Sequence, residues 1–219
     1  MRRSVVIEVA TAMVLACATG TAGASPVHAT SYSMPNGDGQ ASGGSLNYWD
    51  RGYTGIGATT VDGAPLSGGL GKLTDGVIAT QVWNTVSNAA GTGQYVGWLK
   101  SVSPNPTIVF TFAATAVINE VDIWLDNSGV GGVVAPSAIL IDGVSRAFTA
   151  PAAGTVGQVS FTGLDLHGAT HTVEFFQGGG NTWTFVSEIA FAVPEPDAAA
   201  LLGIGLLATL ALRRRRSGR

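Results

Sequence analysis

Apolar and polar residues alternate along two neighbouring segments in the middle of the chain. In TIVFTF, residues 107–112, the alternation puts Ile108, Phe110 and Phe112 on one face, and it resumes through residues 117–125. Successive side chains of a β-strand point to opposite faces, so a period of two predicts strands with one buried face. Between residues 25 and 192 no window carries a sustained helical stripe of apolar residues. This part of the chain is therefore expected to be all-β.

Turn signals separate these strands from several others. Asp142-Gly143 stands between residues 138–141 and 144–148, and an Asp-Gly pair tolerates the positive φ angles of a tight hairpin turn. Strands are also predicted over residues 155–161, 170–176 and 183–191. Glycines gather at residues 37–44, 67–71, 91–97, 129–132 and 178–180. Short strands with glycine-rich loops between them predict a β-sandwich, in which residues 31–45 are either a loose first strand with its loop or a partly disordered lead-in.

The first 24 residues have the features of a secretory signal peptide. Arg2 and Arg3 form a positive start, residues 9–18 are apolar, and Ala22-Gly23-Ala24 has the small-x-small pattern of a signal peptidase site. We therefore predict export and a mature chain without cysteine, which excludes disulfides and thiolate metal sites. Cys17 in VLAC leaves open an alternative, cleavage and lipidation as a lipoprotein.

Residues 193–219 combine three unlike signals in a fixed order. The prolines at 194 and 196 each remove a backbone donor and restrict the residue before them, so the folded part is expected to end here. Residues 198–212 carry no charge and make about 22 Å of helix, a marginal span for a hydrocarbon core of about 30 Å. The arginines at 213–216 and 219 can snorkel to the headgroups, and they predict a cytoplasmic C-terminus with the rest of the chain outside.

The motif Pro194, Glu195, Pro196, followed by a short transmembrane helix and a basic end, resembles the PEP-CTERM sorting signal of Gram-negative bacteria. The resemblance implies that an exosortase, a membrane-embedded cysteine protease, processes the tail and that the protein reaches the cell surface or the extracellular matrix. Hosts of this system usually also make exopolysaccharide. An ordinary C-terminal membrane anchor is the alternative, although such an anchor has no need of Pro-Glu-Pro. The chain thus divides into a signal peptide (1–24), one domain (25–192) and a sorting signal (193–219) with its helix at 198–212.

The charge of the exported domain differs from that of the whole chain. The formal net charge of −3 includes the arginines of both ends, whereas residues 25–192 carry four basic side chains against eleven acidic ones, a formal charge of −7. Nucleic acids and anionic lipid headgroups are bound by basic surfaces. The composition therefore argues against both as partners of this domain.

Two further segments suggest a family. Residues 71–83, GKLTDGVIATQVW, and residues 183–191, WTFVSEIAF, together with the strands between them, resemble the F5/8 type C, or discoidin-like, family of galactose-binding-like β-sandwiches. That family includes many bacterial carbohydrate-binding modules, and the resemblance covers most of residues 31–192. It implies an eight-stranded jelly roll whose first and last strands lie close together, often with bound calcium.

The resemblance also implies which residues would hold calcium. In the family pattern the positions of Lys72 and Val77 supply backbone carbonyls, that of Asp75 a carboxylate, and that of Thr80 a carbonyl and a hydroxyl. Glu188 adds a second carboxylate, which completes a set of oxygen ligands suited to a hard divalent cation. Val77 departs from the Asp or Asn that relatives often have, at a position that gives only its carbonyl. The alternative is a plain turn around Asp75, with Glu188 in a salt bridge at a sheet edge.

In the same family, sugars bind to loops at one end of the sandwich, where aromatic rings stack on the pyranose. Aromatic residues among glycines and charges are expected to be more exposed than those in alternating strands. The candidates are therefore the aromatic and cationic residues in such segments: Trp49, Arg51, Tyr53, Tyr95 and Trp98. Trp124 and Trp183 lie in alternating strands and are expected in the core.

The sequence gives little support for a catalytic function. The three histidines have no nucleophile in a recognisable motif, His171 is expected to point outward from its strand, and Glu120 with Asp122 reads as a solvated strand face. We therefore predict a non-catalytic surface or matrix protein whose sandwich binds carbohydrate, either exopolysaccharide or a surface glycan, and holds structural calcium. The alternative is a structural or adhesion matrix protein that acts through protein contacts and has no sugar site.

Overall fold

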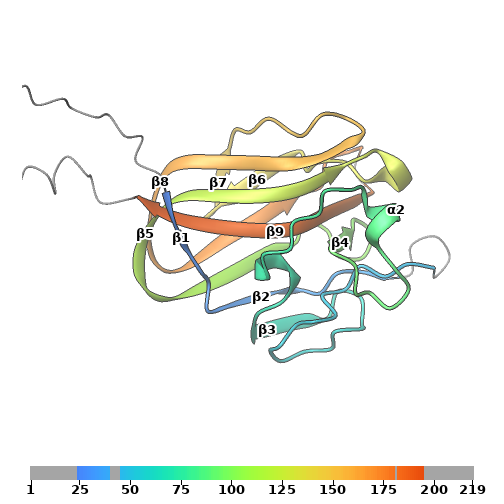
Figure 1. Ribbon diagram of the computed structural model, residues 1–219, viewed down its shortest axis with the longest axis horizontal. Coiled ribbons are helices and arrows are strands. Elements are labelled where there is room, and N and C mark those ends of the chain that lie inside the picture. Colours follow the sequence, from blue (N-terminus) through green and yellow to red (C-terminus); the bar gives the residue numbers. More distant parts are fainter. Residues whose placement is uncertain (1–23, 40–44, 181, 195–219) are drawn as a thin grey trace, which may run out of the picture. The chain divides into compact units, whose positions relative to one another are not determined.

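The computed structural model describes residues 24–39, 45–180 and 182–194, which fall in one compact unit (Figure 1). The predicted signal peptide, the helix predicted at 198–212, and Glu195 and Pro196 of the sorting motif lie outside the described residues. A search of the described residues for an apolar helix long enough to cross a membrane finds none.

Nine strands are formed by the described residues, and helix is limited to single turns. In chain order the strands are β1 (Ala24–Val27), β2 (Ser31–Pro35), β3 (Pro65–Gly69), β4 (Val96–Leu99), β5 (Thr107–Asn127), β6 (Ala138–Ile141), β7 (Val144–Arg146), β8 (Thr155–Phe176) and β9 (Trp183–Pro194). The helical turns are the 3-10 turns η1 (Lys72–Thr74) and η2 (Val130–Gly132) and the α-helical turn α2 (Trp83–Val86). The predicted all-β class is confirmed.

The long strands β5 and β8 organise the sandwich. The main hydrogen-bonded order is β1-β9-β5-β8-β6-β7, with β2 paired to β5 and β3, and β4 paired to β9. The start of β5 pairs with β2 through residues 109–111, whereas its later part pairs with β9 through residues 120–125. Register shifts interrupt β5 between Thr111 and Ala116 and again before Glu120, and bulges of this kind bend a strand. The sheet can therefore curl over on itself, as Figure 1 shows.

The curled sheet encloses the core that the alternation predicts. Ile108, Phe110 and Phe112 are buried, as are Val121, Ile123 and Leu125 from the later part of β5. Phe191 on β9 bridges the two parts of β5, because its ring lies 4.8 Å from that of Phe110 and 5.1 Å from that of Phe112 in the first part, and it is the register partner of Val121 in the later part. The segments 107–112 and 117–125, predicted as two strands, are thus one bent strand, and 155–161 and 170–176 are likewise joined in β8.

Short-range predictions of turns and strand ends are largely confirmed. Asp142 and Gly143 both have positive φ angles, 49° and 74°, as the tight hairpin between β6 and β7 requires. The first and last strands are neighbours, because β1 pairs with residues 191–194 of β9. The expectation that no strand continues into Val193 and Pro194 is wrong. A proline is tolerated at the end of a strand, and Pro194 there is the register partner of Ala24.

Candidate functional site

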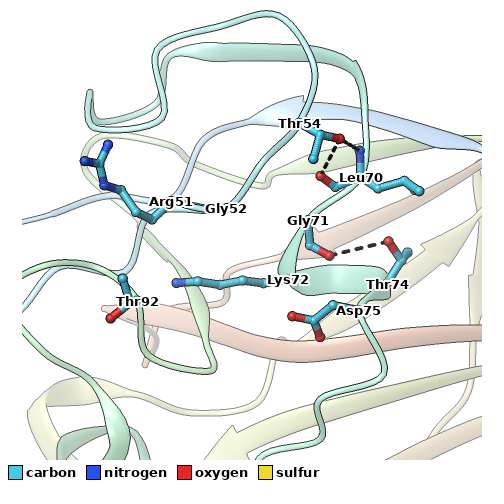
Figure 2. Close-up of a pocket in the computed structure, with 9 residues that line it drawn as sticks. All are labelled: Arg51, Gly52, Thr54, Leu70, Gly71, Lys72, Thr74, Asp75 and Thr92. Carbon is cyan, nitrogen blue, oxygen red and sulfur yellow. Dashed lines mark hydrogen bonds between the residues drawn. The ribbon is translucent and has the colours of Figure 1, made fainter.

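An open hollow of about 600 Å³ lies beside η1 and brings together residues that the sequence predicts for two different roles (Figure 2). We call it the η1 pocket and define it by its lining: Arg51, Gly52, Thr54, Leu70, Gly71, Lys72, Thr74, Asp75 and Thr92. Arg51 is a predicted ligand-binding residue, whereas Lys72 and Asp75 are predicted calcium ligands. The pocket is therefore the first candidate for a binding site.

Lys72 holds the loops around this pocket together. Its side chain is buried, and its Nζ donates to the carbonyl oxygens of Trp49 at 2.6 Å, Gly91 at 2.6 Å and Tyr95 at 3.3 Å. Burial lowers the pKa of Lys72 to about 8, while the nearby charges of Asp50 and Asp75 act in the opposite direction. The ammonium group thus joins two loops to η1 from within.

Asp50 lies directly beneath η1 and fixes its start. Its carboxylate accepts hydrogen bonds from the backbone N–H of Lys72, at 3.1 Å, and from the hydroxyl of Tyr32. Its own N–H donates to Asn36 Oδ1 at 2.9 Å. Burial raises the pKa of Asp50, and these donors partly counter the rise. The wall of the η1 pocket is therefore a rigid, hydrogen-bonded structure.

At Gly71 this wall leaves no room for a side chain. A Cβ atom at Gly71 would collide with both carboxylate oxygens of Asp50, whereas a Cβ at Gly52, in the same pocket, would meet no atom within 4 Å. We expect Gly71→Ala to lower the free energy of unfolding by about 1–3 kcal/mol, because Asp50 cannot move without losing its donors. Gly52→Ala is the matched control and should melt within a degree or two of the unmodified protein. Equal melting curves for the two variants would contradict this packing.

Asp75 and Glu188 form an acidic pair around the turn that follows η1. Asp75 Oδ1 accepts from the N–H of Val77 at 2.9 Å, and Glu188 Oε2 accepts from the N–H of Gly76 at 3.2 Å. Burial raises the pKa of Glu188 to about 7, and the charge of Asp75 adds to the rise against the lowering effect of the Gly76 N–H. Glu188 also lines a second hollow, of about 430 Å³, between β1, β9 and this turn.

These two residues fit the chemistry of a calcium site in part. Two carboxylates that repel one another are stabilised by a divalent cation between them, and both come from the predicted ligand set. Lys72 and Val77 are predicted to supply only backbone carbonyls. Thr80, predicted to supply a carbonyl and a hydroxyl, is exposed and lines a third hollow with Gln81, Thr85 and Thr155. Within the described ranges no cluster of three or more His, Cys, Asp or Glu side chains suits a metal ion. A cation bound here would thus need backbone carbonyls for most of its ligands.

Three of the predicted sugar-binding aromatics are buried, so the expectation that they are exposed is wrong. Trp98 is fully buried, donates from Nε1 to the carbonyl of Pro35 at 2.9 Å and stacks on Phe175. Tyr95 is buried with its hydroxyl on the carbonyl of Gln81, and Tyr53 is buried with its hydroxyl on that of Tyr32. Trp98 and Tyr95 join the core because β4 pairs with β9, and Tyr53 joins it because its ring packs 5.2 Å from that of Tyr32 on β2.

The remaining predicted residues keep an accessible surface. Arg51 is exposed, and Trp49 is half-buried with its Nε1 donating to Asp62 Oδ1 at 2.7 Å. Of the two tryptophans expected in the core, Trp183 is buried and Trp124 is only half-buried. Ligand stacking on Tyr53, Tyr95 or Trp98 therefore has no support in this geometry, and Arg51 is the predicted residue best placed to meet a ligand.

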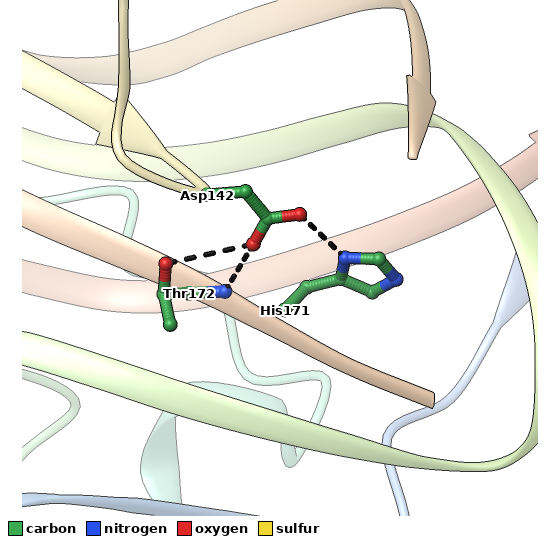
Figure 3. A network of polar contacts seen from close by, with 3 residues as sticks. All are labelled: Asp142, His171 and Thr172. Carbon is green, nitrogen blue, oxygen red and sulfur yellow. Dashed lines mark hydrogen bonds and ion pairs between the residues drawn. The ribbon is translucent and has the colours of Figure 1, made fainter. Parts of the chain in front are cut away.

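His171, expected to point outward, is buried instead. Its Nδ1 lies 2.7 Å from Asp142 Oδ2, and Asp142 Oδ1 accepts from the N–H of Thr172 at 2.7 Å (Figure 3). The ring of Phe112 is its aromatic neighbour at 5.9 Å. The side chain of Asp142 thus ties the β6–β7 turn to β8. The contact between Asp142 and His171 was not predicted from the sequence, because Asp142 was assigned only to the hairpin turn.

The curled all-β sheet with its paired first and last strands is that of a discoidin-like sandwich. The chain belongs to that family. The family described as "Discoidin domain-containing receptor 1/2, DS-like domain" matches residues 29–142, and the PEP-CTERM protein-sorting motif matches residues 192–216. No curated protein matches the chain.

Three solved structures illustrate the weak overall similarity of this chain to known sandwiches. A structure of the Streptococcus pneumoniae β-galactosidase BgaA has a TM-score of 0.38 and 11% identity, over 55% of this chain and 82% of that chain. The CBM32 of AlyQ in complex with 4,5-unsaturated mannuronic acid has a TM-score of 0.31 and 14% identity, over 44% and 75%. A fucolectin from the serum of striped bass, Morone saxatilis, has a TM-score of 0.34 and 12% identity, over 79% and 80%. At these scores no conclusion about ligands passes from those proteins to this one.

Proposed function

We propose that the protein is exported, sorted by an exosortase and displayed at the cell surface or in the extracellular matrix, where its discoidin-like sandwich binds carbohydrate without catalysis. The sorting motif over residues 192–216 supports the destination. Exopolysaccharide or a surface glycan is the ligand class, and calcium at Asp75 and Glu188 has a structural role.

The observation that carries the binding proposal is the η1 pocket. Its lining offers hydroxyl groups from Thr54, Thr74 and Thr92, a carboxylate from Asp75 and a guanidinium from Arg51. Several convergent polar groups in one hollow are what sugar hydroxyls need for orientation. Its volume also lies within the range of about 300–1,000 Å³ that is typical of ligand sites. Sugar recognition at this pocket would depend on hydrogen bonds more than on aromatic stacking.

The burial of Tyr53, Tyr95 and Trp98 favours a second candidate function. With these three rings buried, the sandwich resembles a structural or adhesion module that acts through protein contacts and has no sugar site. The two candidates differ in one measurable property, which is retention by glycans.

Affinity electrophoresis of the full-length chain, kept soluble with a nonionic detergent, tests the first candidate. A panel of soluble polysaccharides, including exopolysaccharide from the host, is cast into the gels with calcium or with a chelator. We expect retardation by one or a few members of the panel, and loss of that retardation in Thr92→Val. Thr85→Val, at an exposed threonine outside the pocket, is the control. Uniform mobility across the panel would reject carbohydrate binding and leave the structural module.

A further inference from the structure

Basic charge in the exported domain is concentrated at one place. Residues 25–192 contain only four basic side chains against eleven acidic ones, and two of the four, Arg51 and Lys72, line the η1 pocket. An acid-rich domain repels anions over most of its surface. The η1 pocket is therefore the part of the described surface best suited to an anionic group.

Arg51 has most of its hydrogen-bonding capacity unused. It is exposed, and among the described residues it makes no ion pair. Its Nη1 donates to Thr59 Oγ1 at 3.4 Å, which is long for a hydrogen bond. A guanidinium carries five N–H donors in a planar fork that matches a carboxylate in two-point contact. This side chain can therefore accept an anion without first breaking a salt bridge.

The two ends of the pocket differ in charge. Figure 2 shows Arg51 and Thr92 towards one side, with the ammonium end of Lys72 extending towards Thr92, and Asp75 on the other side. The Lys72 charge is held in place by three backbone carbonyls, so it stays close to the pocket. An acidic group is favoured at the Arg51 end, whereas Asp75 accepts hydrogen bonds from hydroxyl groups.

On this basis we infer that the η1 pocket binds an acidic sugar, a hexuronate residue whose carboxylate contacts Arg51 and whose hydroxyls bond to Asp75. The inference rests on the proposed carbohydrate binding and specifies its ligand class. A neutral sugar leaves the guanidinium of Arg51 without an anion. The carboxylate of a hexuronate is planar and can accept two parallel N–H bonds from the guanidinium of Arg51.

The test compares polymers that share one backbone. Polygalacturonate and its fully methyl-esterified form differ only at the carboxyl group, which is a charged carboxylate in the first and a neutral methyl ester in the second. A sulfated neutral polysaccharide supplies charge of another geometry. The full-length chain in nonionic detergent is run through each by affinity electrophoresis with a chelator present, so that a calcium bridge between Asp75 and a carboxylate cannot produce the result. We expect retardation by polygalacturonate alone, and weaker retardation at higher ionic strength.

Variants at Arg51 identify the contact. Arg51→Gln should lower the affinity for polygalacturonate about tenfold or more, because a charge-assisted bond is lost. Arg51→Lys should fall between Gln and the unmodified protein, because it keeps the charge without the fork. Lys100→Gln makes the same charge change outside the pocket, at a residue whose Nζ donates to the carbonyl of Gly178, and should bind like the unmodified protein.

The outcomes separate this inference from the proposed function. Equal retardation by the acidic and the esterified polymer, retardation by the sulfated polymer to the same degree, or an unchanged Arg51→Gln variant would each overturn the hexuronate assignment while carbohydrate binding stands. Retardation by no polysaccharide would overturn both. A thermal melt of each variant shows whether a loss of binding comes with a loss of folding, and binding lost only in unfolded variants counts against Arg51 as the contact.

Discussion

Replacement of Lys72 by methionine is expected to lower the free energy of unfolding by about 3 kcal/mol. The ammonium of Lys72 donates to three backbone carbonyls, two of them in buried contacts, and an unsatisfied buried polar group costs about 1–3 kcal/mol. Part of the loss is offset, since methionine fills the same space without burying a charge. The measurement is denaturant unfolding at pH 7, with Lys100→Met as the control, because Lys100 is half-buried and donates to one carbonyl only.

The pH dependence of the same variant gives an independent check. Burial lowers the pKa of Lys72 from its ordinary value near 10.5 to about 8, so between pH 8 and 10.5 the unfolded chain holds more protons than the folded one. Lys72 therefore contributes a rise in stability as pH increases through that window. The rise should be smaller in Lys72→Met and unchanged in Lys100→Met. If Lys72→Met unfolds like Lys100→Met at pH 7, the three carbonyls do not depend on the ammonium.

Glu188 should give the opposite pH dependence, with an effect of similar size. Burial raises its pKa from an ordinary 4.5 to about 7, so between these values the folded chain holds more protons than the unfolded one. Its contribution to stability is full below pH 4.5 and is lost as pH rises through 7, by at most about 3.5 kcal/mol, since each pKa unit corresponds to about 1.4 kcal/mol. Without calcium, Glu188→Gln should remove this loss and be more stable than the unmodified protein at pH 8.

Calcium should act on the same group. If calcium binds between Asp75 and Glu188, it competes with the proton on Glu188, so added calcium should raise the melting temperature at pH 8 and have little effect at pH 5. Glu188→Gln and Asp75→Ala should both lose that response, whereas Glu174→Gln, the same change on β8, should keep it. A calcium response of equal size at both pH values, or one that survives in Glu188→Gln, would contradict the site.

The parts of the fold that depend on local pattern were predictable. The buried faces of residues 107–112 and 117–125 follow from a period of two, and the β6–β7 hairpin follows from Asp142-Gly143. The continuity of β5 across residues 113–116 was not predictable, because a bulge has no fixed sequence signature. The discoidin-like family was recognisable because residues 71–83 and 183–191 carry spaced motifs.

The candidate site was harder to predict, because its contacts join distant segments. Trp98 looked like a loop residue among glycines, yet β4 pairs with β9, more than eighty residues later, and that pairing carries Trp98 inward. Lys72 was predicted only as a calcium ligand through its backbone carbonyl. No nearby sequence motif indicated that its ammonium group would bind the carbonyls of Trp49, Gly91 and Tyr95. The exposure of Arg51 was predictable, because a charged residue among polar neighbours is most often exposed. Arg51 is exposed in the structure.

The pairing of β1 with β9 also determines how the domain responds to a pulling force. Ala24, at the start of β1, is the register partner of Pro194, at the end of β9. A load applied between these two ends therefore opens the pair like a zipper and breaks its hydrogen bonds one after another, which needs little force. A load applied between Pro194 and a point elsewhere in the sandwich pulls on β9, which is paired with β4 and β5 as well as β1, so several ladders resist it together. A domain held by its C-terminal strand is thus mechanically strong, while its N-terminal strand can peel away under a small load.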